Sequence, residues 1–271
     1  MLFEAALLGI VQGLTEFLPV SSSAHLILAR ALFGWDAEQF GIVFDVAIHV
    51  GTLLGVVLYF APELAALARA LPRAVGGAGD AAARQVRLLV VGTLPIVPAG
   101  LLYTDAVEAL LRTPLVATVA LGVGAVLLLA ADRVGVRERT ETGLTLGEAV
   151  GLGLAQAAAL VPGVSRSGAT ITLAVFLGLR RDAAARFSFL LGIPAILAAA
   201  MLTGLEAVRE GLPPGSGLVM LTGAASAAVV GYLSVKYFLR YVSRHSLDVF
   251  AYYRLALAGA VGVWLMRGVW S

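Results

Sequence analysis

The sequence predicts an all-α membrane protein, a polytopic helical bundle with six full transmembrane helices and two oppositely oriented re-entrant helix hairpins that form an inverted repeat. Hydrophobic residues make up 60% of the 271 residues and charged residues only 13%, which is too apolar for an ordinary soluble domain. Long apolar runs recur along the chain, each about long enough to cross roughly 30 Å of hydrocarbon as a helix. Two further apolar stretches are interrupted by proline, serine and charged residues.

The first half of the chain begins with one of these broken stretches, residues 1–33. Pro19 ends its first apolar arm, and the serines that follow can cap a second short helix. A segment of this kind enters and leaves the membrane on the same side when its broken backbone lines a cavity. Uninterrupted apolar runs then predict full crossings at 40–61, 88–104 and 114–132.

The second half follows the same order. Residues 147–180 form the second broken stretch, which is interrupted at Pro162 and at the serines that flank Arg166. Full crossings are then expected at 185–205, 216–240 and 247–269. The whole chain, 1–271, is expected to be a single membrane domain whose approximate repeat halves are 1–132 and 147–271.

Basic residues indicate how these segments are oriented. Short cytoplasmic loops collect Lys and Arg, and thirteen of the nineteen basic residues fall in four connections. With six full crossings, these connections share one side only if neither broken stretch crosses the bilayer. The hairpins then enter from opposite sides. The four groups are Arg69, Arg73, Arg84 and Arg87; Arg133, Arg137 and Arg139; Arg180, Arg181 and Arg186; and Lys236, Arg240 and Arg244.

The two broken stretches also resemble each other. Gly9-Ile10-Val11-Gln12 is similar to Gly153-Leu154-Ala155-Gln156, and each stretch carries a later Ser-x-Ser. Transporters built from inverted repeats place a polar site near the midplane, where their broken helices meet. The functional site is therefore expected where the two hairpins meet.

The first hairpin supplies candidate catalytic groups. Gln12 and Glu16 are four residues apart, so on a helix they share a face and can present oxygens to a metal ion or ligand. His25 follows Ser22 by three residues, which places imidazole and hydroxyl on the same side of the second short helix. A hydroxyl beside a titratable base is a minimal arrangement for nucleophilic or acid/base catalysis.

The second hairpin adds a positive charge. Arg166 lies between Ser165 and Ser167, and a guanidinium can bind a phosphate through paired N–H bonds. Helix N-termini at both breaks would add positive dipole ends. Together these features favour a phosphorylated ligand at the midplane, with Glu16 on a divalent cation.

Other polar residues have simpler interpretations. His49 is explained equally well by packing in the core and by a role beside the site, and the same holds for Asp45. Tyr252, Tyr253 and Arg254 favour an interfacial belt, and solvation explains His245 in a basic loop. We expect none of them in the core site. The serines of the two breaks gain weight only from their clustering, because a lone membrane serine usually bonds its own helix.

The two motifs are similar to those of a known family. Gln12-Gly13-Leu14-Thr15-Glu16-Phe17-Leu18-Pro19-Val20-Ser21-Ser22-Ser23-Ala24-His25 resembles the first signature of the bacterial undecaprenyl-pyrophosphate phosphatases, the bacitracin-resistance family. Pro162-Gly163-Val164-Ser165-Arg166-Ser167-Gly168-Ala169-Thr170 resembles their Pro-Gly-x-Ser-Arg-Ser-x-x-Thr signature at every position. Length and motif spacing match as well, so the resemblance covers essentially the whole chain.

The resemblance implies a multi-pass phosphatase of the bacterial inner (plasma) membrane, which removes the terminal phosphate of undecaprenyl pyrophosphate and so recycles the lipid carrier of cell-wall synthesis. By position, Glu16 would coordinate a divalent cation (Mg²⁺ or Ca²⁺) or orient the attacking group. Ser22 would be the candidate nucleophile, His25 its acid/base or nucleophilic partner, and Arg166 the residue that binds the pyrophosphate. The remaining motif residues expected to bind substrate are Gln12, Ser21, Ser23, Ser165, Ser167 and Thr170.

Gln12 stands where many family members carry a second glutamate, which makes a two-carboxylate metal site doubtful and puts more weight on Glu16. The expected partners are a polyprenyl pyrophosphate lipid and the bilayer, with no nucleic acid. The sequence leaves open whether the chain forms a homodimer and whether Ser22, His25 or water attacks. The alternative function is a transporter or flippase of polyprenyl phosphate lipids. An ion channel or scaffold is disfavoured, because packing requires no charge within the membrane.

Overall fold

The structure is a helical bundle built around two short helix pairs. The computed structural model describes residues 1–35, 40–77, 79–102, 110–210 and 216–267, and their regular structure is helical apart from one isolated bridge. Five helical spans in these residues are long and apolar enough to cross a membrane. The predicted all-α polytopic bundle is therefore confirmed. The spans are Ala81–Leu102, which combines α5 (Ala81–Thr93) and α6 (Ile96–Leu102), then α8 (Pro114–Val134), α11 (Arg181–Glu210), α12 (Ser216–Val242) and α13 (Asp248–Met266).

A bent helix pair is a sixth candidate span. Helix α3 (Ile42–Tyr59) is followed by α4 (Ala61–Val75), and the two helices meet at an angle of 83°. The connection that carries Arg69, Arg73, Arg84 and Arg87 is not the loop expected from its basic residues, because α4 and the start of α5 occupy it. Helix α4 is amphipathic: Leu67, Ala70 and Ala74 are buried against α5, while arginines lie on its exposed side. Apolar side chains three and four residues apart are typical of a surface helix, so the sequence did carry a signal for α4.

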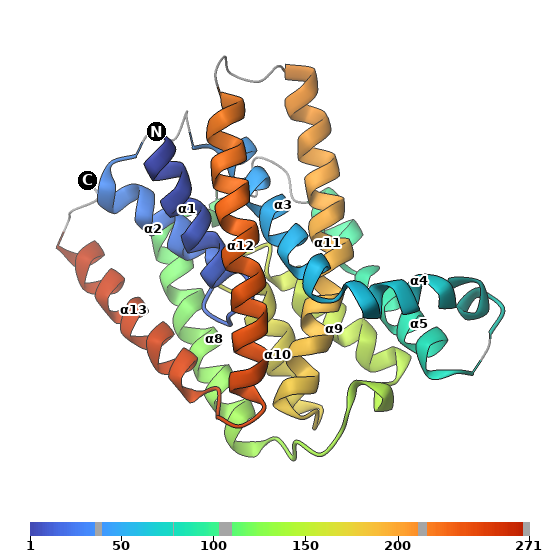
Figure 1. Ribbon diagram of the computed structural model, residues 1–271. Helices are drawn as coiled ribbons and strands as arrows, with labels where there is room; N and C mark the ends of the chain where they lie inside the picture. The colour runs from blue at the N-terminus through green and yellow to red at the C-terminus, as the bar shows by residue number, and fades with distance from the viewer. Residues whose placement is uncertain (36–39, 78, 103–109, 211–215, 268–271) are drawn as a thin grey trace.

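The two predicted hairpins are present as helix pairs. Helices α1 (Leu2–Thr15) and α2 (Ser22–Phe33) form the first, and α9 (Leu146–Ala158) and α10 (Arg166–Phe176) the second. The separation in sequence between the two helix starts is the same in both pairs. The outer ends of the first pair, away from its break, point toward the top of the molecule, and those of the second pair point toward the bottom (Figure 1). Their re-entrant insertion, and the single domain with halves 1–132 and 147–271, stay predictions.

Glycines let each pair pack closely on the opposite half of the chain. Helix α1 lies on α12, where a Cβ added at Gly9 would overlap the carbonyl of Gly223. Helix α9 lies on α5, where a Cβ added at Gly153 would overlap the carbonyl of Gly92. Gly9 and Gly153 stand at the same position within α1 and α9, counted from the start of each helix. The same close contact therefore recurs in both halves, which supports the inverted repeat.

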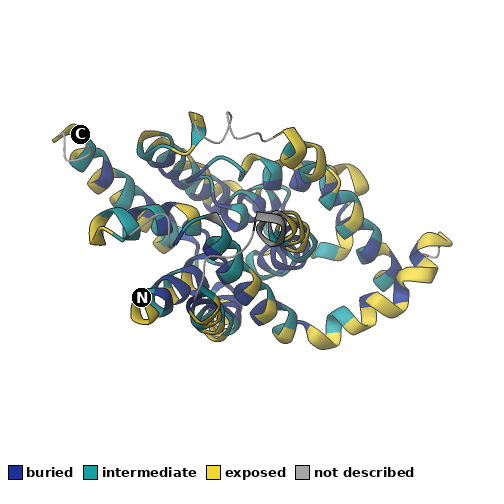
Figure 2. Cartoon of the chain, turned by 90° about the horizontal axis from the view of Figure 1, so that it is seen from above, coloured by how far each residue is buried: buried dark blue, intermediate teal, exposed yellow. Residues whose placement is uncertain are grey.

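The outer surface of the bundle is apolar. Figure 2 shows buried residues toward the interior and exposed ones on the outward faces of the helices and along the arm formed by α4 and α5. Many of the exposed side chains on the spans are large and hydrophobic, such as Leu115 and Val119 on α8 and Leu218 and Leu221 on α12. A surface of this kind is suited to lipid rather than water.

Candidate active site

The centre of the site is the Glu16 carboxylate, which lies directly after the last residue of α1 and is only 6% exposed. Ser22 Oγ donates a hydrogen bond to Glu16 Oε2 at 2.7 Å, and Gln12 Nε2 donates to the same oxygen at 3.0 Å. Arg166 Nη2 lies 3.0 Å from the other oxygen, Oε1. Residues far apart in the chain therefore meet over one carboxylate.

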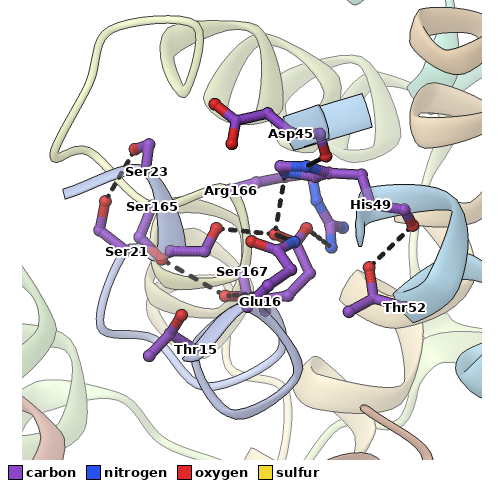
Figure 3. A network of polar contacts seen from close by, with 12 residues as sticks. Thr15, Glu16, Ser21, Ser23, Asp45, His49, Thr52, Ser165, Arg166 and Ser167 are labelled. Carbon is purple, nitrogen blue, oxygen red and sulfur yellow. Dashed lines mark hydrogen bonds and ion pairs between the residues drawn. The ribbon is translucent and has the colours of Figure 1, made fainter. Parts of the chain in front are cut away.

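The two breaks have the same backbone conformation. Ser21 and Ser165 each precede the second helix of their pair, and both have a positive φ, at 74° and 70°. A positive φ is uncommon for a residue with a side chain and is often kept at functional sites. Ser21 Oγ lies 3.2 Å from Ser23 Oγ, and Ser165 Oγ lies 3.3 Å from Ser167 Oγ. Each predicted Ser-x-Ser thus forms the same internal contact (Figure 3).

Side chains of the second break bind the first break directly. Ser167 Oγ is within hydrogen-bonding distance of the carbonyl oxygens of Glu16 and Leu18, at 3.2 and 3.0 Å. Arg166 begins α10 and extends beside Gly192 of α11, where a Cβ would overlap the guanidinium. The two breaks are therefore in contact, and the arginine is held beside the carboxylate rather than extended toward lipid.

A cavity of about 390 Å³ lies beside this centre. Its polar lining combines one carboxylate from the first break with a guanidinium from the second. Apolar residues that directly follow α9 and apolar residues of α11 form much of the remaining wall. The lining residues are Glu16, Ser21, Ser22, Ser23, Leu26, Ile27, Asp45, Val46, His49, Ile96, Arg112, Gln156, Ala159, Leu160, Pro162, Ser165, Arg166, Ala195, Ile196, Ala199 and Ala200.

Six of the predicted site residues line this cavity, namely Glu16, Ser21, Ser22, Ser23, Ser165 and Arg166. Gln12 and Ser167 lie just behind it and contact Glu16. Thr170 is buried away from the cavity, where it pairs with Ser188 of α11 at 2.5 Å.

His25 also lies outside the cavity lining. Its Nδ1 is 2.7 Å from the Ser21 carbonyl oxygen, and its Nε2 is 2.6 Å from the Tyr253 hydroxyl on α13. Although His25 and Ser22 are three residues apart, the imidazole is directed toward α13 while the hydroxyl is directed toward Glu16. The structure therefore separates the two groups that the sequence had placed side by side.

His49 lies beside the site, which is one of the two readings that the sequence left open for it. Its Nε2 lies 3.6 Å from Glu16 Oε2, and its Nδ1 lies 2.6 Å from the Asp45 carbonyl oxygen. Asp45, one turn earlier on α3, pairs with both Arg30 and Arg112 where it lines the cavity. Within the apolar run of α3, the i, i+4 spacing of Asp45 and His49 was the available signal that one face is polar.

The expectation that Arg254 belongs to an interfacial belt was wrong. Arg254 is completely buried, and its guanidinium donates to backbone carbonyls on three elements. Pro19 is an acceptor in the first break, Gly163 and Val164 are acceptors in the second, and Ala120 and Leu121 are acceptors on α8. Gly124 leaves space for this side chain, because a Cβ there would overlap it. Arg254 therefore connects the two breaks from behind.

The first hairpin has oxygens that suit a hard divalent cation. Among the described residues no three acidic, His or Cys side chains form a metal cluster. Mg²⁺ is, however, commonly held by one or two carboxylates together with substrate phosphates. Glu16 supplies one carboxylate, and the buried Oε1 of Gln12 beside it has no hydrogen-bond partner among those residues. The donor set therefore fits a cation that is shared with a phosphorylated ligand.

The fold and the site define a polytopic membrane protein whose central cavity is lined by a guanidinium, a carboxylate and serine hydroxyls. The sequence profile of the family described as bacitracin resistance protein BacA matches residues 5–260, and the chain belongs to this family. Together with the apolar spans, this makes it a multi-pass protein of the bacterial inner (plasma) membrane.

Several curated relatives are similar over nearly their full length, and each is named undecaprenyl-diphosphatase. The relative from Rubrobacter xylanophilus is 47% identical over 98% of both chains. The relative from Geobacter metallireducens is 46% identical over 95% of both chains. A third, from Thermomicrobium roseum, is 45% identical over 94% of this chain and 95% of its own.

Proposed function

We propose that this protein is an undecaprenyl-diphosphatase, which hydrolyses undecaprenyl pyrophosphate to undecaprenyl phosphate and inorganic phosphate. The main support for this proposal is that Arg166 and Ser22 contact the two oxygens of Glu16, beside a cavity among apolar helices. Phosphoryl transfer needs positioning and neutralisation of charge more than other chemistry. A membrane site suits a substrate whose polar head carries a long prenyl chain.

Ser22 is the attacking group in this proposal. Its hydroxyl already donates to Glu16 Oε2, so the carboxylate can accept the proton as Oγ attacks the terminal phosphorus. A bond forms between Oγ and phosphorus, and the bridging P–O bond breaks to release the lipid phosphate. Water then hydrolyses the phosphoserine, and the proton leaves Glu16. Arg166 binds the pyrophosphate and stabilises the negative charge that develops on the oxygens of the departing lipid phosphate.

A divalent cation is part of the proposal. Glu16 and the Gln12 carbonyl would hold it, and when bound it would neutralise phosphate charge. His25 lies outside the cavity and contacts the Ser21 carbonyl oxygen, so it would affect the reaction indirectly, through the first break. It would not be the nucleophile. All of these residues come from one chain, so the proposed reaction requires no homodimer.

Phosphate release from a detergent-solubilised prenyl pyrophosphate, with Mg²⁺, with Ca²⁺ and with a chelator, tests the reaction. We expect a cation-dependent rate that falls at least about 100-fold in Glu16→Gln and Ser22→Ala. Arg166→Lys keeps a charge beside Glu16 and should fold, but it loses the paired N–H groups and should fall about tenfold or more. Unchanged rates in all three variants would refute the site.

Labelling of the terminal phosphate distinguishes the nucleophiles. The wild type should retain label on the protein after rapid acid quenching, Ser22→Ala should retain none, and His25→Ala should retain it. Label that survives alkaline quenching but is lost in acid would lie on a histidine and would contradict the assignment. The transporter alternative predicts movement of lipid phosphate across vesicles without release of inorganic phosphate, so reconstitution of the purified protein into vesicles decides between the two functions.

A further inference from the structure

Gln156 is a buried polar side chain that the proposed reaction has not used. It lies on α9 at the repeat position of Gln12 on α1, and its relative exposure is 0%. Gln156 lines the cavity, yet neither atom of its carboxamide has a hydrogen-bond partner among the described residues. An unpaired buried polar group destabilises the folded state, and buried amides in native proteins are nearly always bonded. The missing partner is therefore expected to be a ligand in the cavity.

At the cavity, the second hairpin presents hydrogen-bond donors and no carboxylate. Arg166 Nε is also buried and unpartnered among the described residues. At the repeat position of Glu16 the second hairpin has Leu160. The Gln156 amide and the Arg166 guanidinium therefore offer N–H groups to an anion where no acidic side chain of their own hairpin competes. The first hairpin, in contrast, carries the carboxylate and the attacking hydroxyl.

The apolar wall of the cavity adjoins this donor pair. Ala159 and Leu160 follow Gln156 by about one helical turn, and Ala195, Ile196 and Ala199 of α11 continue the lining. Ala199 is exposed, as are the neighbouring Leu197 and Met201, so the wall reaches the lipid-facing surface. A prenyl chain leaving the cavity along this wall would place the phosphate to which it is attached beside Gln156.

We propose that Gln156, together with Arg166, binds the phosphate that remains on the lipid, while the first hairpin acts on the terminal phosphate. The inference rests on the proposed function and deepens it, because each of the two repeated hairpins then binds one phosphate of the pyrophosphate. The Gln156 amide donates to an oxygen of the lipid-linked phosphate before and after cleavage. Gln156 is thus a binding residue for both substrate and lipid product.

Gln156→Leu tests this inference, because leucine has a similar volume and no polar atoms. Binding of farnesyl phosphate by calorimetry requires no turnover, and we expect it to weaken about tenfold, with a similar rise in KM for farnesyl pyrophosphate. Inhibition by inorganic phosphate and kcat should each change less than about threefold. The unfolding temperature should stay the same or rise, since an unpaired buried amide is removed. Gln85→Leu removes an amide that bonds Glu63 outside the cavity, and it should leave farnesyl phosphate binding unchanged.

Three results would overturn the inference. Unchanged farnesyl phosphate binding in Gln156→Leu would exclude contact with the lipid-linked phosphate. An equal loss of inorganic phosphate inhibition would assign Gln156 to the terminal phosphate instead. A lower unfolding temperature would give it a structural role. If the wild type releases no phosphate, the proposed reaction fails, and the farnesyl phosphate binding comparison still decides the role of Gln156.

Discussion

Single buried polar residues organise this site, and Arg254 is the clearest example. Its guanidinium is bonded to carbonyl oxygens and to no acidic side chain among the described residues. Carbonyls at both breaks lack their usual helical N–H partners, and Arg254 supplies donors to three of them, Pro19, Gly163 and Val164. The relative position of Ser22 and Arg166 therefore depends on a residue that does not touch the cavity.

We expect Arg254→Met to lower both stability and activity. The substitution leaves buried carbonyls without donors, which should lower the free energy of unfolding by about 3 kcal/mol. A shift between the two breaks should lower kcat/KM about tenfold or more. Thermal unfolding in detergent and phosphate release measure the two effects. Tyr252→Phe is the control, because the Tyr252 hydroxyl bonds Arg133 at the exposed surface, and wild-type behaviour of Arg254→Met would disprove the role.

The short helix pairs show how far sequence reasoning extends. Proline, serine and charge are costly in hydrocarbon, so both breaks and their contact at Glu16 and Arg166 could be predicted. His49, Gln156 and Arg254 could not be assigned in the same way. One polar residue within an apolar run does not reveal whether it meets lipid, a carbonyl or a cavity, because that depends on which helix packs against it. Helix α4 was missed because its arginines also fit a loop.

The repeated helix contacts make a paired prediction. Gly9→Ala and Gly153→Ala each place a methyl group against a backbone carbonyl on a neighbouring helix, which cannot move aside as a side chain would. Each should lower the free energy of unfolding by about 1–3 kcal/mol. Gly147→Ala, also on α9, meets nothing within 4 Å and should be neutral or stabilising by up to about 1 kcal/mol. Equal stability of all three variants in thermal unfolding would argue against the close contacts.

The start of α9 carries a pH-dependent contact. Arg139 donates hydrogen bonds to the carboxylate of Glu148, which also caps the helix with Thr145, and these bonds lower the pKa of Glu148 to about 2. A carboxyl group whose pKa is lowered by folding adds stability above its unfolded pKa of about 4.5, and that stability is lost as pH falls toward about 2.

Wild type should therefore be more stable than Glu148→Gln at neutral pH, and the difference should shrink between about pH 4.5 and about pH 2. Thermal unfolding across that range measures it. Glu138→Gln changes an exposed carboxylate in the same connection and should show no such dependence. A difference between wild type and Glu148→Gln that is independent of pH would show that the Arg139 contact adds no stability.

At the scale of the whole molecule, three of the four basic connections gather at one end of the bundle. Ion pairs there join separate elements, including Arg181 with Asp132 and Arg186 with Glu63. The connections between α8 and α9, α10 and α11, and α12 and α13 lie together at the bottom of Figure 1, opposite both termini. This agrees with cytoplasmic basic loops and with hairpins that do not cross the bilayer.

Cysteine labelling tests that arrangement, because the chain contains no cysteine and each variant has a single thiol. Gly79→Cys lies between α4 and α5, Ser243→Cys between α12 and α13, and Arg267→Cys after α13. A membrane-impermeant maleimide should label Arg267→Cys in intact cells and the other two only after permeabilisation. Four full spans separate positions 79 and 243, so the two thiols share a side only if the α9 and α10 pair does not cross. Labelling of these two thiols from opposite sides would show that this pair spans the membrane, and the opposed insertion of the two hairpins would be wrong.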